Sequence, residues 1–126
     1  MIRVLYIAIG GAIGALLRYF VSGIAYKFMG TTFPYGTLSV NLIGSFLIGF
    51  FFEALKESLV SPDIRMMIFI GIFGAFTTFS SFSLETVNLI RDGEILFAIW
   101  NILLNNIFGI GLAFLGIILA KSFIVK

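Results

Sequence analysis

The chain is 126 residues long, 60% of them hydrophobic, and it carries a formal net charge of only +2. A soluble domain of this size cannot bury so much apolar surface, so the composition predicts an integral membrane protein. The small net charge gives no reason to expect a nucleic-acid partner. Because the chain has no cysteine and no histidine, disulfides, thiolate chemistry and most metal or nucleophilic catalytic sites are excluded, and we expect no enzyme.

Four apolar runs hold most of the hydrophobic residues. A helix needs roughly 20 residues to cross a bilayer, and the runs lack the alternation that is typical of barrel strands. The sequence therefore predicts an all-α membrane protein with four transmembrane helices, the second being the shortest and extended by flanking residues. The runs cover Val4 to Phe28, Gly36 to Phe52, Met66 to Asn88, and Ile95 to Ala120.

Short polar connections separate the runs. They cover Met29 to Tyr35, Lys56 to Arg65, and Arg91 to Glu94. No connection is long enough for a soluble domain, so we expect residues 1–126 to form a single four-helix transmembrane channel domain. The first run is too long for the core of a signal peptide and is read as a helix.

The basic residues favour one orientation only weakly. Five of them are predicted on the side of the N-terminus and two on the other side, which leans toward a cytoplasmic N-terminus. Long basic side chains near helix ends can snorkel, so insertion in both orientations stays open. The five are Arg3, Lys56, Arg65, Lys121 and Lys126, and the two are Lys27 and Arg91.

The first two helices each carry one stripe of small or polar residues spaced four apart, which places them on a single face. Small residues in such stripes are explained by helix packing in lipid. Arg18 and Asn41 are harder to explain in this way, because polar residues at membrane depth are functional by default. The stripes are Gly10, Gly14, Arg18 and Ser22, followed by Thr37, Asn41, Ser45, Gly49 and Glu53.

The third helix is rich in hydroxyl groups. Five of the seven residues from Thr77 to Ser83 are serine or threonine, and Gly71 and Gly74 precede them. Such residues bend or loosen a helix, so we predict a break in mid-membrane. A break exposes carbonyl oxygens that suit a small hard cation. The alternative is a continuous helix whose hydroxyls bond internally.

Phenylalanines recur every third residue through the same segment. We expect Phe73 and Phe76 to face lipid. Serines and threonines surround Phe79 and Phe82, and the electropositive edge of an aromatic ring can help to hold an anion. Because Glu53 and Glu85 lie toward helix ends, no mid-membrane carboxylate is expected to attract a cation along this path.

The fourth helix carries a third stripe, formed by Asn101, Asn105, Gly109 and Ala113. Its small members again predict packing, whereas Asn105 calls for a further explanation.

Three of these segments resemble the Fluc (CrcB) family of fluoride channels. The run from Gly74 to Glu85, GAFTTFSSFSLE, resembles the family signature. The runs from Gly10 to Tyr19 and from Gly36 to Gly49 match its first and second helices. The fourth helix departs from the family pattern, which often has tyrosine near position 101 and serine near position 105. The roles of Asn101, Asn105 and Asn106 therefore do not carry over.

The resemblance implies a passive channel that lowers cytoplasmic fluoride. It implies an antiparallel homodimer, inserted in both orientations in a prokaryotic plasma (inner) membrane, with two pores and a central structural sodium ion. Phe79 and Phe82 would form the phenylalanine box of the pore and Asn41 would line it. The implied partners are fluoride, sodium, a second copy of the chain and the lipid bilayer.

The remaining site residues follow from the same resemblance. The backbone carbonyls of Gly74 and Thr77, taken from both subunits, would hold the sodium. Thr78 and Ser81 would lie in the polar track, Arg18 would lie near the aqueous vestibule, and Asn105 is added to the candidate pore residues.

Two other classes of protein stay open. A small multidrug-type antiporter also has four helices, but it needs a membrane-embedded carboxylate, whereas the first helix offers Arg18 and no acid. A structural subunit of a larger membrane complex would need the packing stripes but not the segment of hydroxyls and phenylalanines. A measurement of ion flux through the purified protein alone would distinguish such a structural subunit from a channel.

Overall fold

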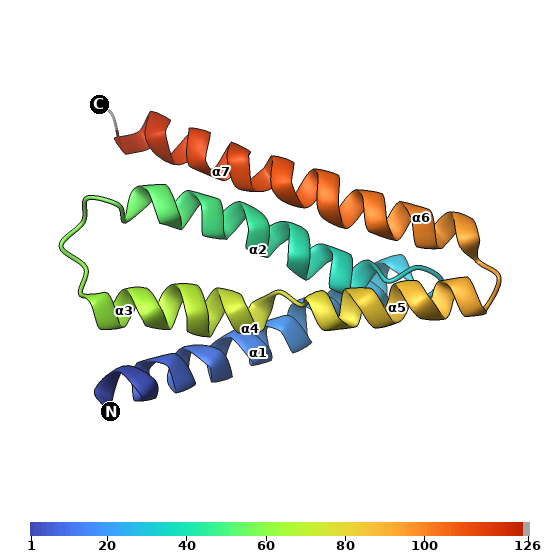
Figure 1. Cartoon of the computed structure of the whole chain (residues 1–126), viewed down its shortest axis with the longest axis horizontal. Coiled ribbons are helices and arrows are strands. Elements are labelled where there is room, and N and C mark those ends of the chain that lie inside the picture. Colours follow the sequence, from blue (N-terminus) through green and yellow to red (C-terminus); the bar gives the residue numbers. More distant parts are fainter. Residues whose placement is uncertain (125–126) are drawn as a thin grey trace.

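The structure is a computed structural model that describes residues 1–124, so Lys126 of the charge count lies outside the described residues. Four long helical spans run side by side, and within residues 1–124 there is no strand (Figure 1). The first span is α1 (Ile2–Met29) and the second is α2 (Tyr35–Ala54). All four spans are long and apolar enough to cross a membrane. The predicted helix number and the short second helix are thereby confirmed.

The third and fourth spans are built from several segments. The third, Pro62–Arg91, contains four: α3 (Pro62–Met66), the π-helix η1 (Met67–Phe73), α4 (Gly74–Phe76) and α5 (Phe79–Arg91). The fourth, Ile95–Ile124, contains three: α6 (Ile95–Leu103), the π-helix η2 (Leu104–Phe108) and α7 (Gly109–Ile124). In Figure 1, α2 lies between α7 and the third span, and the start of α1 lies at the same end of the molecule as the end of α7.

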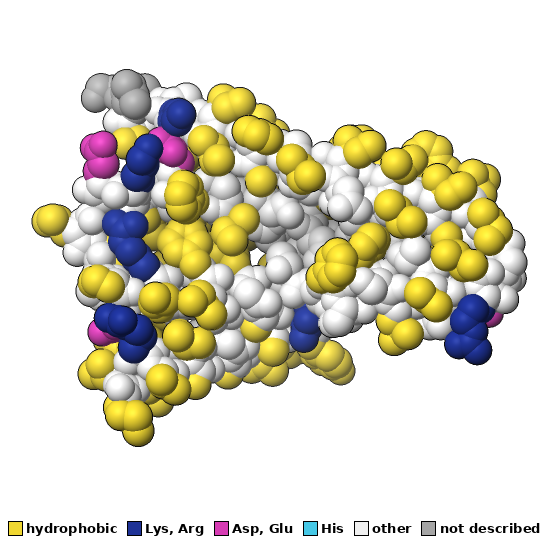
Figure 2. All heavy atoms as spheres, viewed as in Figure 1, with side chains coloured by type: hydrophobic (Ala, Val, Ile, Leu, Met, Phe, Trp, Pro, Cys, Tyr) yellow, Lys and Arg dark blue, Asp and Glu magenta, His cyan; other side chains and the backbone are white. Residues whose placement is uncertain are grey.

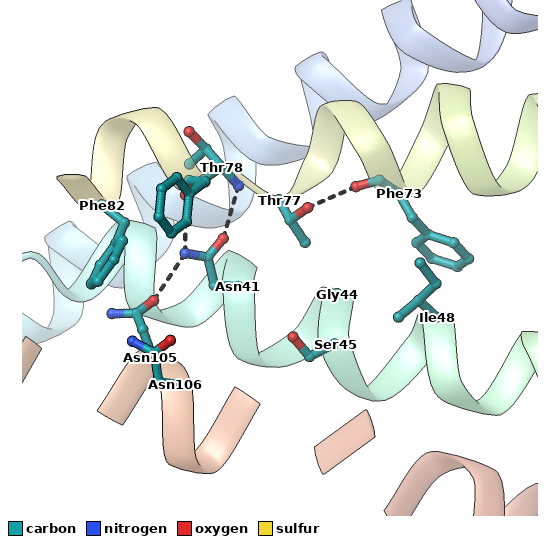
Figure 3. A pocket seen from close by; sticks show the side chains of 11 residues that line it. Asn41, Gly44, Ser45, Ile48, Phe73, Thr77, Thr78, Phe82, Asn105 and Asn106 are labelled. Atoms are coloured by element: carbon teal, nitrogen blue, oxygen red, sulfur yellow. Dashed lines mark hydrogen bonds between the residues drawn. The ribbon is translucent and has the colours of Figure 1, made fainter. Parts of the chain in front are cut away.

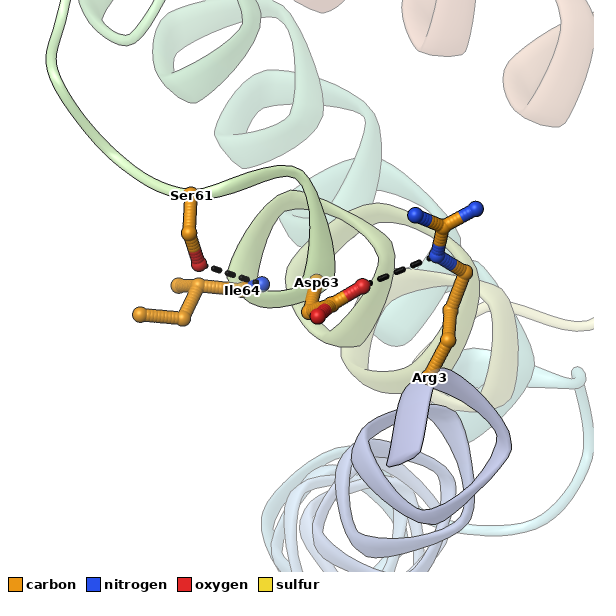
Figure 4. A network of polar contacts seen from close by, with 4 residues as sticks. All are labelled: Arg3, Ser61, Asp63 and Ile64. Atoms are coloured by element: carbon orange, nitrogen blue, oxygen red, sulfur yellow. Dashed lines mark hydrogen bonds and ion pairs between the residues drawn. The ribbon is translucent and has the colours of Figure 1, made fainter. Parts of the chain in front are cut away.

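The ends of the spans follow from local chemistry. Gly30 and Gly93 have φ of 88° and 79°, a left-handed conformation that glycine adopts without steric cost, and each ends a helix. The third span begins with Ser61, whose hydroxyl accepts a hydrogen bond from the Ile64 N–H at 3.3 Å (Figure 4). Pro62 occupies the first helical position, where it needs no N–H donor.

Most charged side chains gather at the two ends of the molecule, and apolar side chains are spread over the surface between them, where one basic side chain also appears (Figure 2). At the end that holds both termini, Arg3 pairs with Asp63 at 2.8 Å (Figure 4). Nearby, the Arg65 guanidinium donates to the carbonyls of Leu55 and Ser58. This arrangement places an apolar belt in the lipid and the charges at its two faces.

A glycine seam, formed by Gly10, Gly14 and Gly71, joins α1 to the third span. A Cβ atom added at Gly14 would strike the Ile72 carbonyl, and one added at Gly10 would strike the Met67 carbonyl. The two backbones therefore approach as closely as helices can. Helices in lipid associate largely through such contacts, so the packing role expected for these small residues is confirmed.

The same kind of contact joins α2 to α7. A Cβ atom at Gly49 would meet the backbone of Ala113, and one at Gly116 would meet the Phe46 carbonyl. Gly109 lies farther along the same face, with its ideal Cβ position 3.6 Å from the Ser45 hydroxyl. The stripes of the second and fourth helices thus face each other, which confirms the packing role of their small residues and identifies the partner of each stripe.

The third span is broken between α4 and α5, which confirms the predicted break. Thr77 (φ −83°, ψ 159°) and Thr78 (φ −148°, ψ 116°) are both extended. The Thr78 hydroxyl then accepts a hydrogen bond from the Ser81 N–H at 3.1 Å, which caps α5. The chain therefore leaves the helix for two residues and starts a new one within the same span.

The prediction that Phe73 and Phe76 face lipid is wrong. The two side chains are only 6% and 5% exposed. Phe76 fills the space beside Gly44, whose ideal Cβ position would lie 3.2 Å from the ring. Phe73 packs against Phe51, with ring centroids 5.9 Å apart. The second helix therefore covers this side of the third span: Gly44 leaves room for Phe76, and Phe51 packs against Phe73.

Candidate functional site

A pocket of about 240 Å³ lies beside the break of the third span. We call it the break pocket. It brings together six of the residues that the sequence predicts for a site, and it adds Ser45, Phe73 and Asn106 to them (Figure 3). The six are Asn41, Thr77, Thr78, Phe79, Phe82 and Asn105. Polar groups of α2, η2 and the break therefore converge on one space within an otherwise apolar protein.

Asn41 pairs with the peptide groups at the break. Its Oδ1 accepts from the Thr78 N–H at 2.8 Å, and its Nδ2 donates to the Thr78 carbonyl at 3.1 Å (Figure 3). The second Nδ2 hydrogen goes to Asn105 Oδ1 at 2.9 Å. Because an unpaired backbone group at membrane depth costs several kcal/mol, this amide replaces the partners that the interrupted helix has lost.

The break leaves two carbonyls without their helical donors. In an uninterrupted α-helix the Thr78 N–H would donate to Gly74 and the Ser81 N–H to Thr77. Instead they donate to Asn41 Oδ1 and to the Thr78 hydroxyl, at 2.8 and 3.1 Å. The Thr77 side chain is held within its own helix by the Phe73 carbonyl at 3.0 Å. The carbonyls of Gly74 and Thr77 are therefore oxygen ligands of the kind that fit a small hard cation.

Phe79 and Phe82 lie together at the break pocket, with ring centroids 5.4 Å apart and a 52° angle between the ring planes. Their environments differ sharply, because Phe82 is 8% exposed and Phe79 is 76% exposed. The single chain thus encloses one ring and leaves its neighbour on the surface. Both rings line the break pocket together with hydroxyl and amide groups.

A chain of amides extends from the break pocket into the fourth span. Asn105 Nδ2 donates to the Asn101 side chain at 3.0 Å, and Asn101 Nδ2 donates to the Thr86 hydroxyl at 2.9 Å. That hydroxyl in turn donates to the Phe82 carbonyl at 2.7 Å. Asn101 is fully buried. Its place on the four-residue stripe was the only signal in the sequence, and the partner Thr86 had none.

Arg18 and Ser81 lie apart from this pocket. They line a second pocket of about 370 Å³ between α1, α2 and α5, together with Thr37 and Glu85. Thr37 donates to one oxygen of the Glu85 carboxylate at 2.8 Å. Thr78 lines both pockets. The predicted residues other than Gly74 therefore line two pockets that share Thr78 at the break, and Glu85, expected only near a helix end, lines the second of them.

These features define a small multi-pass membrane protein whose polar sites are built around a broken helix. The family described as CrcB-like protein, Camphor Resistance (CrcB), matches residues 5–117. A fluoride-specific ion channel FluC of Parabacteroides distasonis is 50% identical over 98% of this chain and 97% of its own length. Those of Geotalea uraniireducens and Citrifermentans bemidjiense are 48% and 46% identical, each over 97% of this chain and 99% of its own length.

The chain belongs to the CrcB family, as its three motifs predict. With four apolar spans and such relatives, it is a multi-pass protein of the bacterial inner membrane. The relatives are named as ion channels, which are membrane transporters and not enzymes. Membership of this family also rules out the small multidrug-type antiporter as an identity for the chain.

Proposed function

We propose that the chain is a fluoride-selective passive channel that exports fluoride from the cytoplasm. The observation that carries the proposal is the break pocket, in which hydroxyl groups, amides and two phenylalanine rings meet around a broken helix. It lies in a chain that is 46–50% identical to proteins named as fluoride-specific ion channels. Fluoride is a compact, strong hydrogen-bond acceptor, so uncharged donors can replace its hydration shell.

The two pockets suggest a route for the ion. Arg18, Ser81 and Glu85 line the second pocket, where a basic side chain would raise the local concentration of anions. Thr78 connects this space to the break pocket, in which Phe79 and Phe82 lie. Rotatable hydroxyls such as those of Thr78 and Ser81 can follow a passing ion.

Asn41 has a more constrained part in this route. Both hydrogens of its Nδ2 are already donated, to Thr78 and to Asn105. Donation to fluoride therefore requires one of these bonds to open, and Asn105 is the partner that can reorient because it is a side chain. The pore roles of Asn41 and Asn105 are in this way linked.

The test of the channel proposal is a flux measurement. The purified protein is reconstituted alone, in buffers that contain sodium, into liposomes loaded with either potassium fluoride or potassium chloride, and a potassium ionophore balances the charge. We expect rapid fluoride release at an ion-selective electrode and negligible chloride release. Equal rates for the two anions would contradict the selectivity, and absence of flux would favour a structural subunit of a membrane complex.

We further propose that the working unit is an antiparallel homodimer with two pores. The support is that the single chain leaves the break pocket open beside Phe79, which is 76% exposed. A second copy related by a two-fold axis in the membrane plane would cover the break pocket of the first copy. The first copy would cover the break pocket of the second in the same way. The basic residues favour one orientation only by five to two, and those near helix ends can snorkel, so the bias that sets orientation is modest.

A single cysteine placed in the connection from Met29 to Tyr35 of this cysteine-free chain tests the orientation. Whole cells are labelled with a membrane-impermeant thiol reagent before and after lysis. About half of the molecules should react from outside if insertion is dual, as the antiparallel dimer requires. Labelling of all or none from outside would mean one orientation and a parallel arrangement.

We propose that a structural sodium ion lies at the dimer centre, held by the carbonyls of Gly74 and Thr77 from both subunits. The support is that both carbonyls have lost the N–H donors of an uninterrupted helix, and carbonyl oxygens are suitable ligands for a hard cation. A bound cation would lock the two breaks together. Thorough replacement of sodium by a bulky organic cation should abolish flux, whereas a merely structural bend would not respond.

A further inference from the structure

We infer that Asn41, Asn105, Asn101 and Thr86 form one positioning device, which we call the amide relay, and that it holds the break of the third span open. The relay starts at the Thr78 peptide and ends at the Phe82 carbonyl. It crosses α2, η2, α6 and α5. Its effect on ion flux rests on the proposed function, whereas its effect on the backbone does not.

The relay has a fixed direction. The Thr78 N–H donates to Asn41 Oδ1, so Asn41 must turn its Nδ2 toward Asn105. Asn105 then accepts through Oδ1 and donates through Nδ2 to the Asn101 side chain at 3.0 Å and to the Asn101 backbone carbonyl at 2.9 Å. Asn101 repeats this pattern and donates to the Thr86 hydroxyl. One peptide group at the break therefore sets the orientation of three side-chain amides, since each amide offers donors on one side and an acceptor on the other.

The first bond of the relay decides the state of the Gly74 carbonyl. If Asn41 Oδ1 did not take the Thr78 N–H, that N–H would be free to return to the Gly74 carbonyl and close the helix. The last bond acts on the other side of the break, where Thr86 binds the Phe82 carbonyl at 2.7 Å. The relay thus fixes both the carbonyl proposed to bind a cation and the backbone of the buried ring.

A substitution at Asn101 distinguishes the relay from a role in packing alone. It is fully buried, and it touches neither Thr78 nor the Gly74 carbonyl through a hydrogen bond. A leucine has nearly the same size and would fill its space without hydrogen bonding. A change at Thr78 in Asn101→Leu would therefore be transmitted through Asn105 and Asn41 rather than by loss of contact.

The experiment measures hydrogen exchange of the Thr78 backbone amide by NMR in detergent, without fluoride or sodium. We expect exchange to rise about fivefold in Asn101→Leu, the size expected from weakening one hydrogen bond. Thr86→Val should show a smaller rise, and Thr86→Ser, which keeps the hydroxyl, should match the parent. The control is Asn88→Leu, the same substitution at an exposed position of α5, which should change nothing.

A second readout links the relay to the cation. In liposomes, Asn101→Leu should need several times more sodium than the parent for half-maximal fluoride flux. Unchanged exchange at Thr78 in a dimeric Asn101→Leu protein would overturn the relay, and if that variant does not fold, Thr86→Val decides in the same way. Faster exchange with an unchanged sodium midpoint would refute the link to the cation. A parent flux that ignores sodium would refute the proposed sodium site and leave the exchange result standing.

Discussion

The glycine seam and the amide relay both join helices inside the membrane, but they do so by opposite means. At the seam, Gly10 and Gly14 offer no side chain, and the backbones of α1 and η1 meet directly. At the relay, each step needs a particular side chain and a particular direction of donation. The seam decides how closely the helices lie, whereas the relay decides where the break stands. Changes to the seam should damage folding, and changes to the relay should damage transport first.

The largest effect is expected at the seam. Gly14→Leu would place a side chain against the Ile72 carbonyl, which is backbone and cannot move aside. We expect a loss of stability of about 3 kcal/mol or more and little monodisperse protein in size-exclusion chromatography. Gly11→Leu is the matched control on the same helix, since nothing lies within 4 Å of its Cβ position. Equal yields of the two variants would show that the close approach is dispensable.

The next largest effect tests the donations from the Asn41 amide, including the step from Asn41 to Asn105. Asn41→Asp removes the donors to Thr78 and Asn105 and, when ionised, repels an anion. Fluoride flux should fall on the order of a hundredfold, the loss expected for two hydrogen bonds, and further than in Asn41→Ala or Asn41→Ser. Liposome flux at equal protein density measures this. An Asp variant that conducts normally would show that the Nδ2 donors of Asn41 serve neither the pore nor the step to Asn105.

Substitutions of the two phenylalanines of the break pocket test whether transport can be damaged without damage to folding. Phe79→Ile and Phe82→Ile keep an apolar side chain but remove the ring edge, so both should reduce fluoride flux about tenfold. Only Phe82→Ile should also reduce stability, by about 1–2 kcal/mol, since Phe82 is buried within the chain. The control is Phe114→Ile on the exposed side of α7. Parent-like flux in both variants would mean that the rings only pack.

The smallest effect is expected from Thr77→Val. The substitution keeps the shape of the side chain and removes only the hydroxyl that donates to the Phe73 carbonyl in the same helix. Such a bond contributes little, so fluoride flux should stay within about twofold of the parent, with the same sodium dependence. A strong change in the sodium midpoint would show that the hydroxyl, and not the backbone carbonyl, contacts the cation.

The sequence predicts much of the fold because lipid imposes strict rules on it. Four apolar runs become four spans, and the cluster of hydroxyls after Gly74 becomes the break at Thr77 and Thr78. These features depend on local composition and on the need to satisfy the backbone in the membrane.

The site was less predictable, because its bonds join helices that are distant in the sequence. Asn41 and Asn105 stand out as polar residues at membrane depth, but no pattern shows that they bind each other or that Thr86 ends the chain. The burial of Phe73 and Phe76 was missed for the same reason, since it depends on Gly44 and Phe51 of another helix. Spacing identifies the face of a helix, whereas the partner of that face is set by tertiary packing.

The π-helix η2 has a consequence for the phase of the fourth span. Four residues of an α-helix turn through about 400°, so a four-residue stripe drifts by about 40° at every repeat. The wider turn of a π-helix offsets this drift between Asn105 and Gly109. Ala113, the next member of the stripe, therefore still faces α2, where it contacts Gly49. A π turn holds about one residue more than an α turn, so removing one residue from η2 would let the segment close as an ordinary α-helix and rotate α7 little. Removing one residue from α6 instead would rotate the rest of the span by about 100° and carry Ala113 away from Gly49. The π-helix is therefore the one place in this span where the chain can be shortened by one residue without separating its polar half from its packing half.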